Sequence, residues 1–233
     1  MNKLFLFLVL SPFLFISCSS DDDYPVTEGY DIKINVGDTF AMPNGTYTIE
    51  DKGNEFIAEI STDGKIIGKH DGVSYIKLKK GNTTYNCKII VDANTTLYAD
   101  MKIFLGVSKP EILKLYGQPT GINKQTYYFS NLSIEYRNAF SFNNQDKVNI
   151  AAIYFTNSYS TLIGKHLSDR YQMVYTEGDQ ILYIDGPDMS NFTVGVIVEV
   201  TVRDIGIYYM NKADVSTKST NRAYQEIPLI FNK

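Results

Sequence analysis

The sequence is poor in the residues that form disulfides, bind metals or take part in catalysis. It has no tryptophan, two histidines and two cysteines among 233 residues. Because Cys87 is the only cysteine after position 18, no internal disulfide can form downstream, and stability must come from packing. Cys87 lies in the stretch TYNCKIIV, where a small buried hydrophobe is expected. Neither His70 nor His166 stands in a recognisable arrangement with it, which argues against a catalytic thiol.

Catalytic motifs are also missing. The chain contains no nucleophile elbow, phosphate loop, zinc-ligand spacing or paired-carboxylate signature. The stretch DGPD (185–188) lacks the alternating oxygen ligands of a calcium loop, so a plain turn is expected there. We therefore expect no metal and no cofactor. An enzyme is only the third choice for the function, since catalytic groups can still assemble from distant residues.

Positive charge is scattered, and long apolar runs are lacking. The 22 basic residues are outnumbered by 26 acidic ones and form no cluster, which argues against nucleic acid as a partner. The apolar run from Leu4 to Ile16 follows Lys3 and is too short to span a membrane. Its length is that of a signal-peptide core, so residues 1–17 are expected to be a signal peptide.

The end of this run resembles a lipoprotein processing site. The residues FISC (15–18) resemble the lipobox of bacterial lipoproteins, although Phe15 stands where that family usually has leucine. The resemblance implies cleavage before Cys18 and attachment of lipids to Cys18. Several acyl chains on one residue would hold the protein stably at a membrane.

The polar residues after the cysteine refine the expected location. Ser19, Ser20, Asp21, Asp22 and Asp23 resemble the surface-export signal of Bacteroidota-type lipoproteins. The alternative reading is a solvated acidic tether, and both can hold together. Residues 18–29 are thus expected to be a lipidated cysteine with its tether. The implied location is the outer membrane, with display at the cell surface preferred over retention on the inner leaflet.

Residues 30–93 read as short strands separated by turns. DIKINV (31–36) alternates apolar and polar residues, FIAEI (56–60) places Phe56, Ala58 and Ile60 on one face, and Asp63-Gly64 marks a turn. In VSYIKLK (73–79), Val73 and Tyr75 are expected on one face, with a shift before Ile76 and Leu78. Strands at this spacing indicate an antiparallel sandwich.

This segment resembles a known surface module. VGDTF (36–40), AEISTDGKIIGKHDGVSYIKL (58–78) and CKIIV (87–91) are similar to the bacterial Ig-like, group 2 family, with Phe56 in place of a tryptophan often found there. The resemblance implies an Ig-like β-sandwich that serves as a spacer or adhesion module. It names an architecture and no chemistry.

The polar stretch 92–100 is expected to be an exposed linker to a second unit, residues 97–233. FLGVSKPEILKLYGQP (104–119) predicts a helix, with Ser108 as N-cap and Glu111 completing a capping box. Ile112, Leu115 and Tyr116 are expected to form its apolar stripe. Gly117 is placed to end the helix, and Pro119 prevents its restart.

Strands are expected to follow at 126–129, 132–136 and 148–155. A helix of this kind before tyrosine-rich strands resembles the SmpA/BamE-like family of envelope lipoprotein domains, through Gly106, Ser108, Glu111, Gly117 and Pro119. The implied fold is α+β with an antiparallel sheet. The fold class of the whole chain is therefore mainly β with α+β.

A tandem helix-plus-meander duplication, with repeats 100–157 and 160–211, is one reading of the second unit. IYFTN (153–157) is echoed by IYYMN (207–211), and the first helix is echoed faintly by 167–179. The competing reading makes 171–185 a hairpin that turns at Glu177-Gly178-Asp179. The tail QEIPLIFNK (225–233) could add an edge strand, because Pro228 excludes a central position.

The tyrosines supply the candidate ligand site. Among 18 tyrosines, alternation along strands places Tyr128, Tyr154 and Tyr208 opposite neighbours such as Ile153 and Phe155. A sheet covered by helices on one side would present these three rings on its open side, where they suit protein or glycan contacts. The alternative is that the rings cover one another or a neighbouring domain.

The function expected from these observations is non-enzymatic. The chain is interpreted as a lipid-anchored surface protein that binds a protein or glycan or acts as a scaffold, with the Ig-like unit as spacer. The second choice, implied by the SmpA/BamE resemblance, is a periplasm-facing accessory of an outer-membrane assembly or transport complex.

Overall fold

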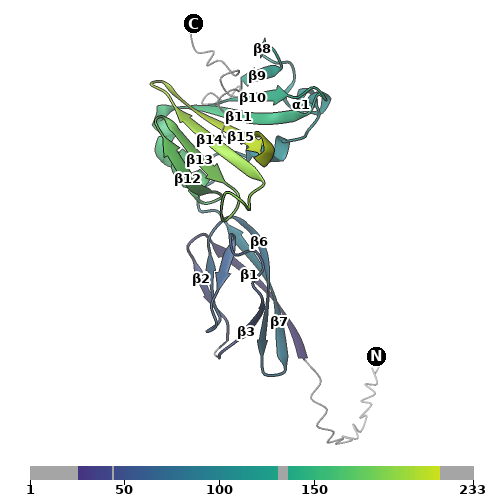
Figure 1. Cartoon of the computed structure of the whole chain (residues 1–233), viewed down its shortest axis with the longest axis vertical. Helices are drawn as coiled ribbons and strands as arrows, with labels where there is room; N and C mark the ends of the chain where they lie inside the picture. Colours follow the sequence, from purple (N-terminus) through teal and green to yellow (C-terminus); the bar gives the residue numbers. More distant parts are fainter. Residues whose placement is uncertain (1–25, 44, 131–135, 216–233) are drawn as a thin grey trace, which may run out of the picture.

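The computed structural model describes residues 26–43, 45–130 and 136–215. The expected signal peptide, Cys18 and the acidic run Asp21–Asp23 lie outside the described residues, as does the expected edge strand in the tail. Two units follow each other along the chain and meet end to end (Figure 1). The described fold is mainly β, with two α-helices in the second unit. Neither helix has the length and apolarity needed to cross a membrane.

Seven strands build the first unit. They are β1 (Val26–Asn35), β2 (Thr39–Ala41), β3 (Thr48–Asp51), β4 (Ala58–Ile60), β5 (Lys65–Gly68), β6 (Gly72–Lys80) and β7 (Thr83–Asp92). One sheet has the order β1-β7-β6-β3, and the other has the order β2-β5-β4. Inward side chains of both sheets form a single buried cluster, so the unit is a two-sheet sandwich.

The two longest strands run in the same direction. β1 and β7 pair in parallel over ten residues, from Val26↔Thr83 to Asn35↔Asp92. The start of β1 lies at the end of the sandwich remote from the second unit, and the end of β7 lies at the near end (Figure 1). The chain therefore enters at one end of the sandwich and leaves at the other.

Strand β6 corrects one expectation about the sandwich. Its buried positions are Ser74, Ile76 and Leu78, in strict alternation with no shift. Val73 and Tyr75 consequently point outward, and Tyr75 is 65% exposed. The expected orientation failed because Ser74 takes an inward position that an apolar residue usually fills. Its larger apolar neighbours Val73 and Tyr75 face water instead.

The second unit is one antiparallel sheet with helices. Its elements are η1 (Met101–Phe104), α1 (Lys109–Tyr116), β8 (Gly121–Asn123), β9 (Thr126–Ser130), β10 (Tyr136–Phe142), β11 (Val148–Thr156), η2 (Asn157–Tyr159), α2 (Ser160–Ser168), β12 (Gln172–Glu177), β13 (Gln180–Ile184), β14 (Val194–Val200), β15 (Asp204–Asn211) and η3 (Lys212–Asp214). The eight strands lie in the order β12-β13-β14-β15-β11-β10-β9-β8. Expected strands at 126–129 and 148–155 match β9 and β11, whereas all of 132–136 except Tyr136 lies outside the described residues.

The two halves of this unit have the same order of elements. Each runs from a 3-10 turn through an α-helix to four antiparallel strands, and the halves meet where β11 pairs with β15. At that seam Ile153 pairs with Ile207. These are the first residues of the echoed stretches IYFTN and IYYMN, so the two stretches begin side by side at the seam. A common origin of the halves stays a prediction.

Both sequence readings of the second half hold in part. The chain from Gln172 to Ile184 is a hairpin with Gly178 at φ 55° in its turn, as the competing reading expected. A helix also precedes it, but α2 covers 160–168 and not the echoed stretch 167–179. Ile163, His166 and Leu167 form its buried side, and Gly164 in their midst weakened the helical signal.

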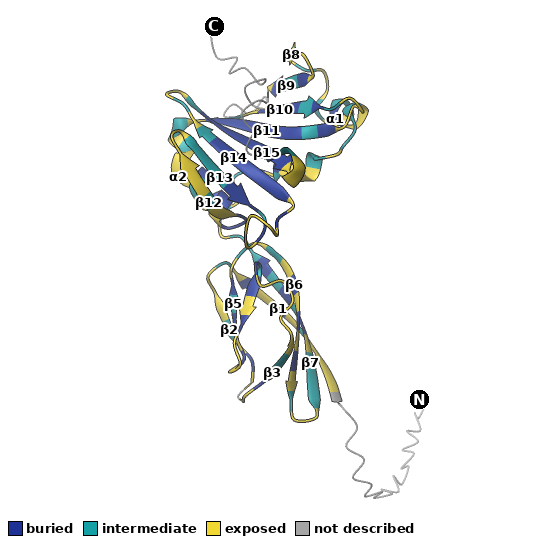
Figure 2. Ribbon diagram, viewed as in Figure 1, coloured by how far each residue is buried: buried dark blue, intermediate teal, exposed yellow. Residues whose placement is uncertain are grey.

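The helices cover one face of the sheet. Ile112 of α1, Ile163 and Leu167 of α2 and Met101 of η1 join a large apolar cluster with strand residues such as Ile153 and Ile207. Dark blue strands in Figure 2 mark this buried interior. We call this side of the sheet the helix-covered face, and the opposite side the second face.

Helix α1 begins and ends as expected. Ser108 is its N-cap in a capping box with Glu111, whose carboxylate accepts the Ser108 N–H at 3.1 Å and also the Ser108 hydroxyl. Gly117 closes the helix at φ 78°. The expected stripe needs one correction: Leu115 is 67% exposed, while Ile112 is fully buried and Leu113 and Tyr116 are half-buried against the core. The helix is thus rotated toward Leu113.

Candidate functional site

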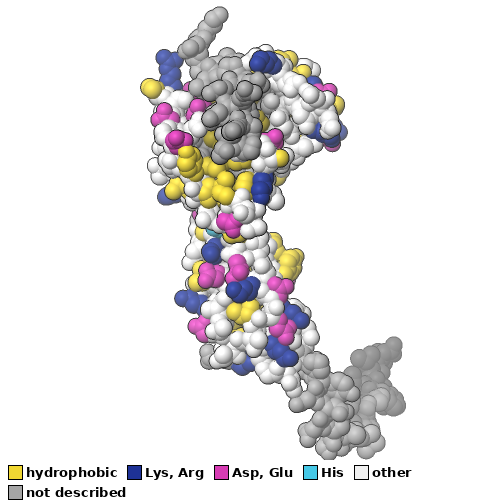
Figure 3. Space-filling view, in the orientation of Figure 1, with side chains coloured by type: hydrophobic (Ala, Val, Ile, Leu, Met, Phe, Trp, Pro, Cys, Tyr) yellow, Lys and Arg dark blue, Asp and Glu magenta, His cyan; other side chains and the backbone are white. Residues whose placement is uncertain are grey.

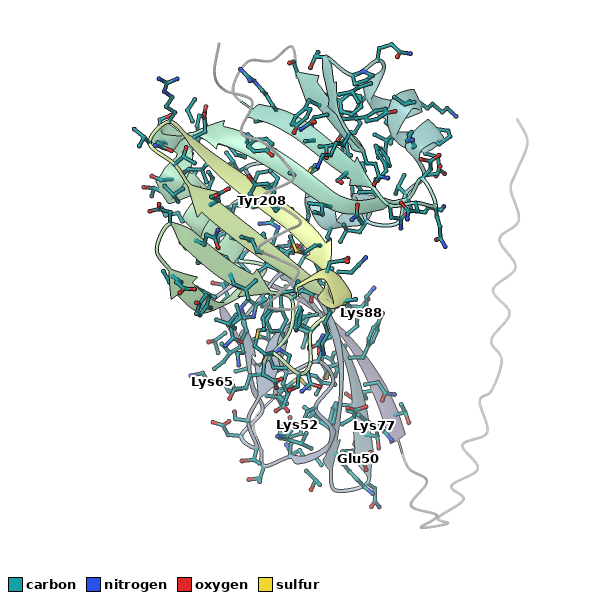
Figure 4. The ribbon with its side chains drawn as sticks, turned by 45° about the horizontal axis from the view of Figure 1, so that its top comes forward. Glu50, Lys52, Lys65, Lys77, Lys88 and Tyr208 are labelled. Atoms are coloured by element: carbon teal, nitrogen blue, oxygen red, sulfur yellow. The ribbon has the colours of Figure 1, made fainter. Side chains whose placement is uncertain are left out.

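The three candidate tyrosines do share one face of the sheet. Tyr128, Tyr154 and Tyr208 belong to or pack against one apolar cluster on the second face, separate from the cluster of Ile153 and Phe155. The rings of Tyr154 and Tyr208 meet edge to face, with centroids 5.8 Å apart. Tyr208, labelled in Figure 4, lies on the broad face of the sheet and its hydroxyl donates to Glu199 at 3.2 Å.

The expected exposure of these rings is wrong. Tyr208 is 0% exposed and Tyr154 is 5% exposed, while Tyr128 is half-buried. Burial raises the pKa of all three hydroxyls above the ordinary value. The alternation along each strand was predictable from the sequence, but whether a sheet face is open depends on what else lies on it. These residues are therefore no ready contact surface for an outside ligand.

A second group of polar side chains lies inside the helix-covered face. The hydroxyls of Tyr98 and Tyr209 are 2.7 Å apart, and Tyr171 donates to Asp100 at 2.6 Å. The Tyr98 ring lies 4.1 Å from the imidazole of His166. Since the tyrosine rings are buried and their pKa values raised by burial, these hydroxyls stay protonated and act as internal hydrogen-bond donors.

His166 and Arg170 connect this group to the chain between the units. Nδ1 of His166 accepts from the Leu97 N–H and from Arg170, each at 3.2 Å, so the imidazole proton sits on Nε2. Arg170 also donates to the carbonyl of Thr95 at 2.7 Å and to the hydroxyl of Thr96 at 3.1 Å. Burial lowers the pKa of His166 to about 4. The imidazole is therefore neutral at physiological pH.

The stretch 92–100 is consequently not the exposed linker that the sequence suggested. The Thr95 N–H donates to the Asp169 carboxylate at 2.7 Å, and the Asn94 amide donates to the Val36 carbonyl at 2.8 Å. The first unit adds its own contacts, because the Asp71 N–H donates to the Asp169 carbonyl at 2.7 Å. The Asp71 carboxylate also lies 3.5 Å from Nε of Arg170. The sequence could not show this, since the partners are 58 to 99 residues apart.

A pocket of about 370 Å³ lies at this junction. The first unit contributes Asn54 and Phe56, and the loop between β13 and β14 contributes the remaining lining residues Asp185, Gly186, Pro187, Asn191, Phe192 and Thr193. The loop is tightly folded, because a Cβ on Gly186 would lie 1.8 Å from the Asn191 carbonyl oxygen. The stretch DGPD is therefore a turn, as expected, but it also forms one wall of a pocket.

The polar groups of the pocket are mostly engaged with one another. Asp185 accepts from the N–H and the hydroxyl of Thr193, at 2.8 and 2.6 Å, and Asp188 accepts from the Asn191 side chain. Phe56 is stacked on His70 with ring centroids 4.0 Å apart. Such a wall offers aromatic edges and amide groups for binding. The one hydroxyl among its lining residues, that of Thr193, donates to Asp185.

Cys87 and the charged residues complete the survey. Cys87 is buried in the sandwich, and its burial raises the thiol pKa to about 11, so the thiol is unreactive at neutral pH. Within residues 26–43, 45–130 and 136–215, no group of three or more histidine, cysteine, aspartate or glutamate side chains could hold a metal. On the face of the sandwich seen in Figure 3, acidic and basic side chains are interspersed.

Comparisons with known proteins assign no family. No protein-family model matches the chain, and no curated protein matches it significantly. One matching solved structure is described as the crystal structure of the C-terminal domain of TagH. It is 9% identical, with 71% of this chain and 96% of that chain covered, and the TM-score is 0.29. That score is too low to support an argument about fold or function. The Ig-like and SmpA/BamE-like resemblances therefore stay predictions.

Proposed function

We propose that the protein is a non-enzymatic lipoprotein of the outer membrane, anchored through Cys18. In this proposal the sandwich is a rigid spacer, and the second unit is the head that binds a protein or glycan or serves as a scaffold. The observation that carries the proposal is the end-to-end arrangement. The start of β1 lies at the far end of the sandwich from the head, so an anchor ahead of β1 and the head are at opposite ends (Figure 1).

The length and stiffness of the sandwich support a spacer role. Ten extended residues of β1 span roughly 33 Å, so the head would be held at least that far from the anchored end. The junction contacts of Arg170, Asp169 and Asp71 fix the two units in one orientation. A flexible tether alone would not hold a head upright.

The pocket at the junction offers a place for a ligand. The junction pocket is lined by both units, so ligand binding there would depend on the relative orientation of the two units. Its aromatic and amide lining suits a sugar or a polar peptide segment better than a reactive substrate. The candidate tyrosines are buried and are left out of this ligand site.

Lipid labelling tests the anchor. Cys18→Ala should abolish incorporation of labelled fatty acid, because the acyl chains would have no attachment point. Cys87→Ala is the matched control: it removes the other cysteine of the chain and should leave labelling intact. Labelled fatty acid in the Cys18→Ala protein would refute the anchor.

Protease treatment of intact cells tests the location. If Asp21, Asp22 and Asp23 form an export signal, changing all three to alanine should leave the protein lipidated but shielded from added protease. Equal digestion before and after the change would remove the export role. Complete shielding of the unmodified protein would instead favour the second function, a periplasm-facing accessory of an outer-membrane complex.

A further inference from the structure

One row of the second face is built of alanine, leucine, isoleucine and tyrosine across six strands. Residues in register from β13 to β9 form this central row: Leu182, Ile197, Tyr208, Ala152, Ala139 and Tyr128. Tyr208 and Ala152 are 0% exposed and Ala139 is 1% exposed. Two alanines stand between two tyrosines in this row, on β11 and β10, and we call this stretch of small side chains the trough. Such a row is buried only if chain lies on top of it.

The described helices do not supply that cover. The buried residues of α1, α2 and η1 all belong to the cluster on the helix-covered face, except for polar His166. Within the described part of the chain, the members of the second-face cluster that lie outside strands are Phe192 and Val215. Val215 rests on Gly195, which is in register with Met210 and Ile184, one row away from Tyr208 and Ala152.

The chain leaves the described region on this same face. A Cβ on Gly195 would lie 2.6 Å from Cγ2 of Val215, so the valine side chain sits directly on the sheet there. Val215 is 5% exposed and is the last described residue. The described chain therefore ends on the second face, one row from Tyr208 and Ala152.

The following segment has the right chemistry and length. It opens with the polar residues STKST (216–220) and carries the apolar run IPLIF (227–231). Its 18 residues can span up to about 60 Å when extended. Three strand spacings separate β15 from β9, or roughly 14 Å, so the apolar run can reach the whole trough.

We propose that residues 216–233 fold back on their own sheet, and that IPLIF (227–231) covers the trough of Ala139 and Ala152 between Tyr208 and Tyr128. The Tyr128 hydroxyl is buried and has no hydrogen-bond partner among the described residues, so a backbone carbonyl of the segment would satisfy it. Pro228 fits this arrangement, because a segment lying across a face needs no ladder hydrogen bond from that residue. This proposal does not depend on the lipid anchor.

Photo-crosslinking of the full chain in cells tests it. Benzoylphenylalanine replaces Tyr128, which conserves an aromatic ring, and the trypsin-cut product is read by mass spectrometry. The expected product joins the position-128 peptide to the peptide 223–233 at the mass of one chain. The matched control carries the same probe at Tyr175, which is half exposed on the edge strand β12 and should give no such product.

The other products overturn the proposal. A cross-link at the mass of two chains would mean that a second copy covers the face, and a cross-link to another protein would mean an outside partner. Cross-linking of 223–233 from position 175 instead of 128 would make the tail an edge strand. A folded protein without any cross-link from position 128 would also refute it.

A substitution within residues 227–231 distinguishes specific docking on the second face from chance proximity of the segment to position 128. Ile230→Asp places a charge in the apolar contact and should lower the cross-link yield from position 128 by about tenfold. Amide hydrogen exchange in β10 and β11 should rise in the same protein. Ser216→Asp adds the same charge before the apolar run and should leave both readouts unchanged. Equal yields in both variants would count against a docked tail.

Discussion

His166 shows at the scale of one residue how burial decides a charge. Its Nδ1 accepts two hydrogen bonds, its Nε2 is buried without a partner among the described residues, and the cationic Arg170 lies beside it. Burial is the main reason that the pKa falls to about 4, and Arg170 lowers it further. Protonation would add a second positive charge to a site that already holds a guanidinium.

This arrangement predicts a loss of stability in mild acid. The unfolded chain gains a proton on His166 near pH 6.5, whereas the folded chain stays neutral down to about pH 4. The contribution is therefore fully present above pH 6.5 and falls as the pH drops. Between pH 7 and pH 5 the loss should be about 2 kcal/mol, measured by urea unfolding.

His166→Gln should lower stability at pH 7 but flatten most of this pH dependence. His70→Gln is the control: burial lowers the pKa of His70 too, but His70 is partly exposed and its Nδ1–H donates to the Phe56 carbonyl at 2.7 Å, which opposes that shift. It should keep most of the slope. If the pH dependence of stability survives in His166→Gln and vanishes in His70→Gln, the effect belongs to His70 and the assignment to His166 is wrong.

At the scale of the element, helix α1 depends on two contacts that the sequence specifies. One is the Glu111 carboxylate, which accepts both the N–H and the hydroxyl of Ser108. Ser108→Ala should cost about 1 kcal/mol, and Glu111→Ala should also lower stability, because the Ser108 N–H loses its acceptor. Because they share one arrangement, the double variant should cost little more than either. Additive losses in thermal unfolding would show that the two residues act separately.

The other contact is the buried side of the helix. Ile112→Ala should cost about 2–5 kcal/mol, because the side chain is fully buried in the core of the second unit. Leu115→Ala, one turn on, should change stability by less than about 0.5 kcal/mol, since Leu115 is largely exposed. Similar losses for both would contradict the rotation of the helix seen here.

These elements also show how far the sequence reaches. The start and end of α1 were predictable, because caps are local and made by residues within a few positions. Strand β10 was not predicted, since YRNAFSF (136–142) has no clean alternation and Asn138 is buried on the helix-covered side beside Phe140. Helix α2 was misplaced by seven residues. Its pattern is interrupted by Gly164, and tertiary packing overrides a weak local preference.

The candidate site was predictable only in part. Register along β9, β11 and β15 follows from a period of two, so the shared face of the three tyrosines could be expected. Their burial could not, because it depends on chain that crosses the sheet from elsewhere. The junction pocket was also missed, since Phe56 and Phe192 are brought together by folding alone.

At the scale of the whole molecule, Arg170 is the residue on which the junction depends. It reaches Thr95, Thr96 and Asp71, which lie on the connecting stretch and on the first unit. In the unmodified protein the first proteolytic cut should therefore fall outside 92–100. Arg170→Ala should move early cleavage into this stretch, because the stretch loses the hydrogen bonds that Arg170 donates to the Thr95 carbonyl and the Thr96 hydroxyl.

Asp71→Asn is the matched control for this prediction. It removes the ion pair with Arg170 but leaves the Arg170 contacts to Thr95 and Thr96 in place. Its cleavage pattern should stay close to that of the unmodified protein. If Arg170→Ala resists proteolysis within 92–100 as well as the control does, then the contacts of Asp169 and Asn94 hold the stretch without Arg170.

The parallel pairing of β1 with β7 has a mechanical consequence. If the protein is anchored ahead of β1 as proposed, a force on the second unit would run from the start of β1 to the end of β7. Two parallel strands drawn from opposite ends are loaded in shear, so all the hydrogen bonds of a ten-residue ladder resist together. An antiparallel pair drawn from adjacent ends would peel apart one bond at a time. The sandwich is therefore built to transmit tension from head to anchor without unravelling.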